Sequence, residues 1–357
     1  MGARSDDGPR REPGPSGRRT RDVVPSGTGR VADHLMRGAS APDVPVVDLV
    51  DGSGVADALS TVGFVAVREH GVPQACLLGM RELLVDLFAV DEATKAQQAI
   101  TRENYRGFIP LRFFTPNRDS GAGDGTDPAD AFEGYKLHWE CPPGHPVSDE
   151  CDLYGPNRWP DHPTRMPKVV ASWWAAMEGL VDRLLDVLAD EMGLDRSVLA
   201  EAMETPLTNT TLLHYPARRP DDLAPGFHPH KDITVVTVLD PNPVGGLEVR
   251  TRDGRWVEAG CPEGALLVNV GDVLEVWSGG RLISTPHRVE ISGGAERYSA
   301  PFFAVPNHRV VAEPMIEPVD GFETRSIPMG YVQAEVWRTN WPDEEAADTH
   351  SHLGGVD

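Results

Sequence analysis

The sequence is poor in lysine and contains no long apolar run. Only four of its 33 basic residues are lysines, Lys95, Lys136, Lys168 and Lys231, and its 55 acidic residues give a net charge of −22. Nucleic-acid binding relies on Lys and Arg that neutralise phosphates, so we expect no nucleic-acid partner. A transmembrane helix needs about 18 or more consecutive apolar residues, so we expect no membrane partner either.

Cysteine is also scarce. The chain has four, and none of them form a C-x-x-C pair: Cys76, Cys141, Cys151 and Cys261. Four scattered cysteines in a chain of this length do not make a disulfide framework. The pair Arg18–Arg19 is not followed by an apolar stretch, which argues against an export signal. We therefore expect a reduced, cytoplasmic protein.

The chain is long enough for one large domain or two small ones. Residues 1–42 are rich in Gly, Pro, Ser and Arg without periodicity, so they are predicted to form a disordered tail. We expect three further parts. Residues 43–200 form a mixed α/β region, residues 201–312 form a β-rich core, and residues 313–357 form a C-terminal segment with a frayed end.

The N-terminal half shows alternating strand and helix signals. Strands are predicted at 44–49 and 63–71, and helices at 54–62, 73–98 and 165–192. Gly193 is a plausible C-cap for the last of these helices. A Gly/Asp-rich loop at 112–130 is a candidate lid over a site.

The pattern changes after residue 208. Short β-rich runs recur between Gly, Pro, Asn and Asp: TTLLHY, ITVVTVL, LEVRT, WVEA, ALLVNVG, LEVWSG, HRVEI and RYSAPFFAV. This pattern is typical of an antiparallel sandwich or barrel. The fold class is therefore α+β, mainly β.

Two histidines and one carboxylate stand out as metal ligands. His230 and Asp232 lie two residues apart in HPHKD, and alternate residues of a strand share a face. A third ligand must come from a distant strand, and His287 in STPHRVEI is placed to supply it. Such a set with open positions suits a non-haem iron(II) centre. His228 shares the same face and competes, but the spacing to the carboxylate favours His230.

Arg297 and Ser299 lie two residues apart in ERYSAP, so they also share a strand face. A guanidinium grips a carboxylate through two parallel hydrogen bonds, and a neighbouring hydroxyl adds a third. The pair therefore indicates a site for an organic acid next to the metal.

Several motifs occur in the order found in a known family. They are VPVVDL (44–49), GFVAVREHGVP (63–73), RGFIPL (106–111), LYGPNRWPD (153–161) and the stretch from GGLEVRT to TPHRV (245–289). Over about residues 43–310 the chain resembles the isopenicillin N synthase-like branch of the iron(II)/2-oxoglutarate-dependent dioxygenases. The resemblance implies a double-stranded β-helix core, a jelly roll of the cupin-like kind, with a helical N-terminal region.

The resemblance also implies roles for residues. His230, Asp232 and His287 would bind Fe(II), and Arg297 and Ser299 would hold the distal carboxylate of 2-oxoglutarate. Dioxygen would be the second co-substrate.

Tyr215 in LLHYP matches a family tyrosine that can touch 2-oxoglutarate, although Leu213 replaces the Asn that many relatives have two residues earlier. Five further residues are candidates for contact with the prime substrate: Asn104, Tyr105, Arg106, Phe303 and Trp337.

The implied function is oxidation of an unactivated C–H bond of a small molecule in specialised metabolism. The outcome could be hydroxylation, desaturation, cyclisation or epoxidation. Three alternatives stay open at this point. They are an iron oxidase of the isopenicillin N synthase type that needs no 2-oxoglutarate, a zinc hydrolase that uses the same three ligands, and a non-catalytic binding protein.

Overall fold

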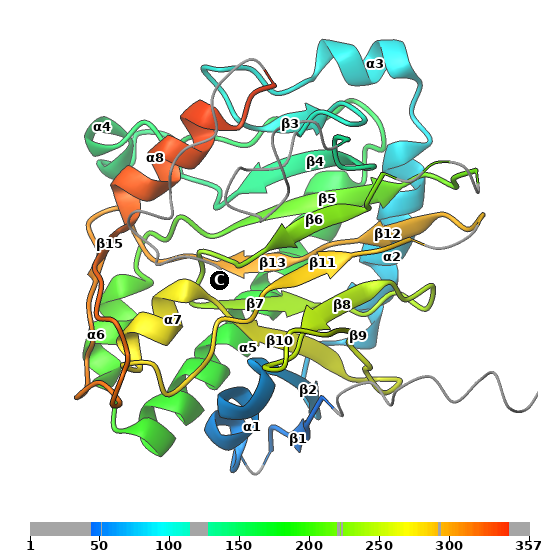
Figure 1. Ribbon diagram of the computed structural model, residues 1–357. Coiled ribbons are helices and arrows are strands. Elements are labelled where there is room, and N and C mark those ends of the chain that lie inside the picture. The colour runs from blue at the N-terminus through cyan, green and yellow to red at the C-terminus, as the bar shows by residue number, and fades with distance from the viewer. Residues whose placement is uncertain are drawn as a thin grey trace, which may run out of the picture. The chain divides into compact units, whose positions relative to one another are not determined.

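The computed structural model describes residues 44–50, 52–114, 128–219, 222, 224–291 and 294–342. The predicted tail at 1–42, most of the candidate lid at 112–130, and residues 343–357 lie outside the described residues. The described part belongs to one compact unit, Ala41–Asp357, shown in Figure 1.

Two antiparallel sheets build the core, as predicted. The larger sheet has the order β1-β2-β10-β7-β13-β5-β4-β3, with β12 also pairing with β5. Its strands are β1 (Val46–Asp48), β2 (Phe64–Arg68), β3 (Gly107–Ile109), β4 (Glu133–His138), β5 (Asn209–Tyr215), β7 (Val236–Leu239), β10 (Leu266–Val270), β12 (Arg297–Ser299) and β13 (Phe302–Ala304). All the pairings are antiparallel except that of β1 with β2.

The smaller sheet has the order β6-β11-β8-β9. Its strands are β6 (Phe227–His230), β8 (Leu247–Arg250), β9 (Trp256–Glu258) and β11 (His287–Val289). Apolar residues join the two sheets, because Tyr215 of the larger one shares a buried cluster with Val289 of the smaller one. A separate pair, β14 (Val311–Ala312) and β15 (Ile327–Pro328), follows the core. The jelly-roll fold class is confirmed.

Helices cover the outer face of the larger sheet. The long helix α5 (Met166–Met192) packs on β7 and β13, and α2 (Gln74–Phe88) packs on β5 and β12, as Figure 1 shows. The rings of Trp173 and Trp174 lie 5.5 and 5.1 Å from that of Phe302. The other helices are α1 (Val55–Val62), α3 (Glu92–Gln97), α4 (Val147–Glu150), α6 (Arg196–Ala202), α7 (Asp272–Trp277) and α8 (Met329–Thr339).

Local sequence explains where these helices begin and end. Gly193 adopts φ 70° at the end of α5, the left-handed conformation that glycine adopts most readily, so the predicted C-cap is confirmed. The helical stretch predicted at 73–98 is interrupted, because Asp91 caps a new helix by accepting a hydrogen bond from the backbone N–H of Thr94.

The run LEVWSG was predicted as a strand, and that prediction was wrong. Most of it belongs to α7, and every residue of this helix is buried. A short helix that is buried on all sides has no apolar face that a 3.6-residue periodicity could reveal, so its sequence resembles that of a buried strand.

The strand argument for the metal ligands was only partly correct. β6 ends at His230, and Asp232 lies beyond it in a stretch without regular structure. Alternation along one strand therefore does not bring these two side chains together. Arg297 and Ser299, in contrast, both lie in β12 opposite Tyr215 and Leu213 of β5, so they share a face as predicted.

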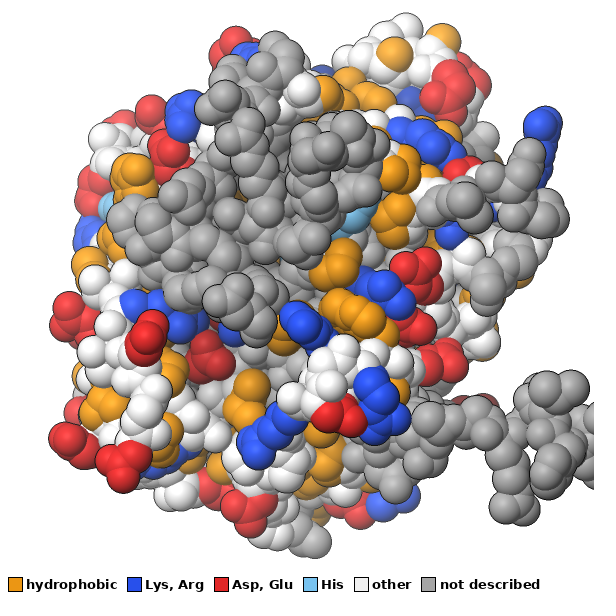
Figure 2. All heavy atoms as spheres, in the orientation of Figure 1, with side chains coloured by type: hydrophobic (Ala, Val, Ile, Leu, Met, Phe, Trp, Pro, Cys, Tyr) orange, Lys and Arg blue, Asp and Glu red, His pale blue; other side chains and the backbone are white. Residues whose placement is uncertain are grey.

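The surface carries charges of both signs. Figure 2 shows acidic and basic side chains interspersed on the face that it draws. All four cysteines are free thiols, consistent with the absence of a disulfide framework. Among the described helices, none combines the length and the apolar character needed to cross a lipid bilayer.

Candidate metal centre and substrate pocket

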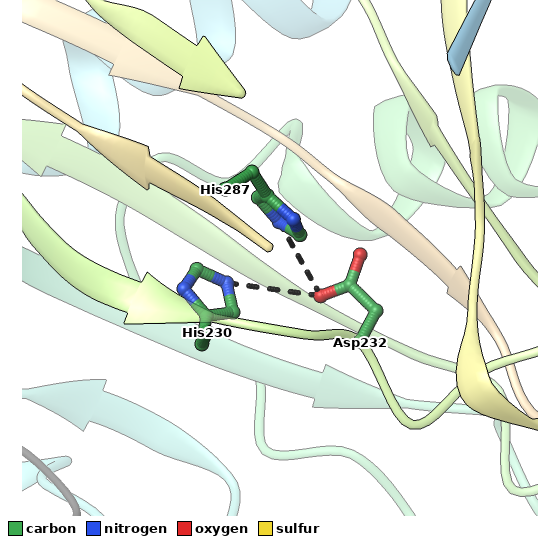
Figure 3. Close-up of side chains that lie close together, drawn as sticks. All are labelled: His230, Asp232 and His287. Atoms are coloured by element: carbon green, nitrogen blue, oxygen red, sulfur yellow. Dashed lines mark ion pairs between the residues drawn. The ribbon is translucent and has the colours of Figure 1, made fainter. Parts of the chain in front are cut away.

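Three side chains from distant parts of the chain converge inside the jelly roll. His230 ends β6, Asp232 follows it, and His287 begins β11, directly opposite His230 in the smaller sheet. The Nε2 atom of each imidazole lies 3.7 Å from Oδ1 of Asp232 (Figure 3). The three ligand atoms lie within 4.8 Å of one another, so one ion can contact all of them.

Backbone carbonyls fix which nitrogen of each histidine faces this point. Nδ1 of His230 lies 2.8 Å from the carbonyl oxygen of His228, and Nδ1 of His287 lies 3.1 Å from that of Thr285. A carbonyl can only accept, so each Nδ1 carries the proton and each Nε2 offers a lone pair. Burial lowers the pKa of His230 to about 4, which keeps its imidazole neutral.

The carboxylate is held in the same way. Oδ2 of Asp232 accepts hydrogen bonds from the Thr237 hydroxyl at 2.7 Å and from the Asn269 amide at 2.8 Å, which leaves Oδ1 for an ion. Burial alone would raise the pKa of Asp232, but the two imidazoles and these hydrogen bonds hold it below its usual value. The group therefore stays an anion.

His228, the competing candidate, does not join this cluster. Its Nδ1 pairs with the buried carboxylate of Asp130, whose Oδ1 also accepts the backbone N–H of His228. Among the described residues, the group placed to hold a metal consists of His230, Asp232 and His287 alone. The structure therefore separates the two histidines that the sequence left in competition.

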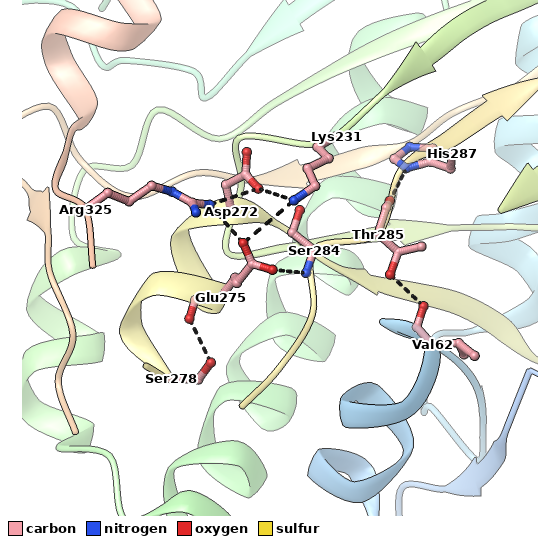
Figure 4. Close-up of polar contacts among 9 residues, drawn as sticks. All are labelled: Val62, Lys231, Asp272, Glu275, Ser278, Ser284, Thr285, His287 and Arg325. Atoms are coloured by element: carbon pink, nitrogen blue, oxygen red, sulfur yellow. Dashed lines mark hydrogen bonds and ion pairs between the residues drawn. The ribbon is translucent and has the colours of Figure 1, made fainter. Parts of the chain in front are cut away.

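An ionic network supports the ligands from the side (Figure 4). Lys231 lies between two ligands in the chain, and its Nζ is 3.8 Å from Oε2 of Glu275 on α7. The same oxygen pairs with Arg325 at 2.8 Å, while Oε1 accepts the backbone N–H of Ser284 at 2.9 Å. The backbone N–H of Asp272 donates to the carbonyl oxygen of Asp232. Glu275 therefore connects the segments that carry all three ligands.

The predicted acid-binding residues lie together on the larger sheet. Arg297 and Ser299 are buried, and the guanidinium of Arg297 lies 4.9 Å from the ring centre of Tyr215. Nε of Arg297 donates to the carbonyl oxygen of Gly245, while its buried Nη1 has no hydrogen-bond partner among the described residues. Burial raises the pKa of Tyr215 to about 12, so its hydroxyl remains protonated.

Most of the predicted substrate residues lie around a cavity that is separate from the three candidate metal-binding side chains. Tyr105 and Trp337 line it together with Lys136, His138 and Asn209. The rings of Tyr105 and Trp337 lie 5.6 Å apart.

The remaining three predicted residues lie next to this lining. Arg106 sits over the ring of Trp337 at 5.6 Å, and Phe303 has the ammonium of Lys136 over its ring at 5.7 Å. Asn104 reaches the site only through a 3.5 Å contact with Arg106. The structure therefore brings Tyr105, Arg106, Phe303 and Trp337 together and leaves Asn104 at the margin.

Several residues of these sites could not be singled out from the sequence. Asn269 and Glu275 contact residues that lie far away in the chain, and Thr237 contacts Asp232 from the following strand, so spacing alone does not reveal these contacts. Lys136 is different, because it is one of only four lysines in a chain whose other 29 basic residues (33 minus 4) are arginines. The rarity of lysine could therefore have pointed to Lys136 as a functional candidate.

Comparison with known proteins settles the family. The model of the 2OG-Fe(II) oxygenase superfamily matches residues 207–306, and that of the non-haem dioxygenase N-terminal region in morphine synthesis matches residues 45–162. The chain belongs to the 2OG-Fe(II) oxygenase superfamily. It is an oxidoreductase that uses iron(II), 2-oxoglutarate and dioxygen, and it acts on a small molecule.

Relatives in this superfamily share most of their length with the chain. Protein DMR6-LIKE OXYGENASE 1 of Arabidopsis thaliana is 26% identical over 312 residues, which cover 85% of this chain and 84% of the relative. The 1-aminocyclopropane-1-carboxylate oxidase of Musa acuminata is 24% identical, and the match covers 76% and 85%. The structure of JOX2 in complex with 2OG, Fe and JA has the same fold, with a TM-score of 0.69, 23% identity, and coverage of 89% and 92%.

The residues present fit the groups that an oxygenase of this superfamily needs. Two imidazole nitrogens and one carboxylate oxygen are a donor set that suits iron(II) and would leave open positions on it. The unpartnered Nη1 of Arg297 is a buried donor that a carboxylate of 2-oxoglutarate would satisfy.

Proposed function

We propose that His230, Asp232 and His287 bind the iron(II) of this oxygenase. The observation that carries the proposal is the convergence of the three ligand atoms, with both imidazoles oriented by backbone carbonyls. Arg297 and Ser299 bind the distal carboxylate of 2-oxoglutarate, and Tyr215 packs against the guanidinium.

When bound, iron and 2-oxoglutarate supply the oxidising power, because dioxygen converts 2-oxoglutarate to succinate and carbon dioxide and transfers one oxygen atom to a C–H bond. The chain's own groups hold the geometry. Thr237 and Asn269 hold Oδ2 of Asp232 by hydrogen bonds and so leave Oδ1 for the iron. Glu275 fixes the segments of His230 and His287 through Lys231 and Ser284. Asp232, His287 and Arg297 are buried, which limits the access of bulk water to them, whereas His230 is partly exposed.

The prime substrate binds in the cavity of Tyr105 and Trp337, with Phe303 and Arg106 beside it and Asn104 at its margin. Two aromatic rings and one guanidinium over a ring suit a small organic molecule with a flat or apolar body. We place the reaction in specialised metabolism, with hydroxylation of a C–H bond as its simplest outcome. We expect no nucleic-acid partner, given the net charge of −22.

The alternative that the sequence alone left open was an iron oxidase that needs no 2-oxoglutarate. The unpartnered Nη1 of Arg297 favours the use of 2-oxoglutarate. Succinate separates the two, because the main proposal requires one succinate for each substrate oxidised and the alternative requires none.

The ligand assignment is tested with two single substitutions, at histidines that lie two residues apart in the chain. We expect His230→Ala to lose anaerobic iron(II) binding and succinate formation. His228→Ala should still bind one iron per chain, because in the parent the His228 side chain pairs with Asp130 and does not face the ion. Iron content and succinate release are measured in both. If the His228 variant lost iron and the His230 variant kept it, the ligand set would be wrong.

The co-substrate assignment is tested with Arg297→Met. Loss of one partner of a buried charge pair costs about 2–5 kcal/mol, so the concentration of 2-oxoglutarate for half-maximal succinate formation should rise at least about 30-fold. Iron binding should stay unchanged, and the exposed Arg68→Met serves as the control. An unchanged 2-oxoglutarate requirement would place the acid elsewhere.

A further inference from the structure

When protonated, Lys136 of β4 carries a charge that the described part of the protein does not balance. Its Nζ donates to Oδ1 of Asn209 at 2.6 Å and to the hydroxyl of Thr211 at 3.1 Å, both on β5. No carboxylate of the described residues forms an ion pair with it, whereas Lys95 pairs with Glu133 and Lys231 pairs with Glu275. Lys136 is only partly exposed, and an ammonium with little access to water and no counter-charge is costly, so an anionic ligand would stabilise it.

The surroundings of Lys136 add a second cation and more free donors. Arg106 is 3% exposed, donates to the carbonyl oxygen of Leu153 at 2.7 Å, and forms no ion pair among the described residues. Its Nε and the indole Nε1 of Trp337 are buried without hydrogen-bond partners in the described part of the chain. Burial lowers the pKa of Lys136 to about 7 and that of Arg106 to about 10, as expected for cations without anionic partners.

The register of the larger sheet connects this pocket to the metal centre. Directly opposed residues point to the same side of a sheet, and one row runs through His138, Asn209, Phe303, Thr237 and Asn269. The last two hold Asp232. Strands are about 4.8 Å apart, so Asn209, which binds Lys136, lies about 10 Å from Thr237. A small molecule can span that distance.

Lys136 is too far from Arg297 to hold the same carboxylate. It pairs with Thr211 on β5, while Arg297 pairs with Tyr215 four residues further along that strand. At about 3.4 Å per residue, Thr211 and Tyr215 are about 14 Å apart along β5. The fold therefore provides two separate cationic positions on either side of β5, and the proposed function uses only one of them for 2-oxoglutarate.

We propose that the prime substrate of this oxygenase is an organic acid whose carboxylate pairs with Lys136. Arg106 adds a second positive charge, and the rings of Tyr105, Trp337 and Phe303 contact the apolar body of the acid. The proposal rests on the proposed function, since it places the oxidised carbon toward the iron. It also means that the pocket has a positive local field in a protein with a net charge of −22.

The test compares acids with neutral analogues of the same shape. Full-length protein loaded with Mn(II) and 2-oxoglutarate is titrated calorimetrically with indole-3-acetate, cinnamate and phenylpropanoate, and with their carboxamides. We expect at least one acid to bind at least about 30-fold more tightly than its amide. That preference should disappear in Lys136→Met, persist in Lys136→Arg, and remain unchanged in Lys168→Met, a control at an exposed lysine.

Several results would overturn the proposal. One is a panel in which no acid exceeds its amide, whether both bind equally or neither binds. Another is an acid preference that survives in Lys136→Met. If phenyl phosphate binds more tightly than every acid, and this affinity is lost in Lys136→Met, the carboxylate assignment is wrong. If Lys136→Met does not fold, the comparison of acid and amide affinities in the parent and in Lys136→Arg still shows whether the pocket prefers a carboxylate. Mn(II) and 2-oxoglutarate affinities measured in the same protein show separately whether the proposed function holds.

Discussion

The hydroxyl of Thr237 on β7 donates to Oδ2 of Asp232 across 2.7 Å. This bond comes from the strand next to β13, and it fixes which carboxylate oxygen remains for the metal. Asp232 itself lies outside any strand, so its orientation depends on such contacts rather than on its own backbone.

Thr237→Val should weaken iron(II) binding by about 10-fold, because partners that orient a metal ligand typically contribute 10–100-fold in affinity and Asn269 still holds the same oxygen. Anaerobic iron titration measures this. Thr210→Val is the matched control, since it removes a buried hydroxyl that donates to the Pro301 carbonyl oxygen and does not contact Asp232. Equal iron affinity in the two variants would contradict the role given to Thr237.

Glu275→Gln should lower both stability and iron affinity. The amide can still accept the Ser284 N–H, but it leaves Lys231 and Arg325 without this anionic partner. Breaking a largely buried ion pair costs about 3 kcal/mol. Urea unfolding measures the change, and Asp48→Asn, which breaks an exposed pair with Arg68, should show little change. If Glu275→Gln were as stable as the parent, the ion pairs of Glu275 would contribute nothing to the stability of the protein.

Glu133 should make stability depend on acid pH. Burial raises its pKa, but hydrogen bonds from His214 and Lys95 outweigh burial and leave the net pKa lowered. Its contribution is therefore fully present above about pH 4.5 and is lost as the pH falls through the lower folded-state value.

The difference in unfolding free energy between the parent and Glu133→Gln should accordingly shrink below about pH 4.5. Unfolding curves at several pH values measure it. Glu92→Gln is the matched control, because Glu92 pairs with the same Lys95 but is exposed. A difference that stays constant down to about pH 3 would show that the charge of Glu133 contributes nothing.

Gly271→Ala should displace the start of α7. A Cβ atom there would lie 2.2 Å from the carbonyl oxygen of Thr234, and backbone cannot yield as a side chain can. We expect a loss of at least about 1–3 kcal/mol and weaker iron binding, since Asp272 next to it bonds to Asp232. Gly260→Ala, which meets nothing within 4 Å, is the control. Unfolding and iron titration together test this.

The proposed ligands could be chosen from the sequence because their chemistry is distinctive. Two histidines, one aspartate and a later Arg-x-Ser in order can be recognised without knowing the path of the chain between them. The structural reason offered for His230 and Asp232 was incomplete, since Asp232 follows β6 rather than belonging to it. Resemblance to a family gave residues that converge in the fold, where strand alternation alone would have given an incorrect geometry.

The residues that the sequence could not reveal are those that act across the sheet. Thr237 and Asn269 become neighbours of the site only through the register of β7 and β10. Register is set by side-chain packing over the whole sheet. The helix α7 was missed because a short segment that is buried on all sides has no face that periodicity could detect.

β2 pairs along its length with β10, and Phe64 at its start packs edge-on against the ring of His287 at 5.6 Å. A fragment trimmed to begin near residue 201 would lose both this ring and the neighbour of β10. It would present an unpaired apolar strand edge to solvent, which is a template for self-association. Shortening this oxygenase to its jelly roll should therefore yield an aggregating polypeptide, and grafting the metal ligands onto another scaffold would have to bring β2 along with them.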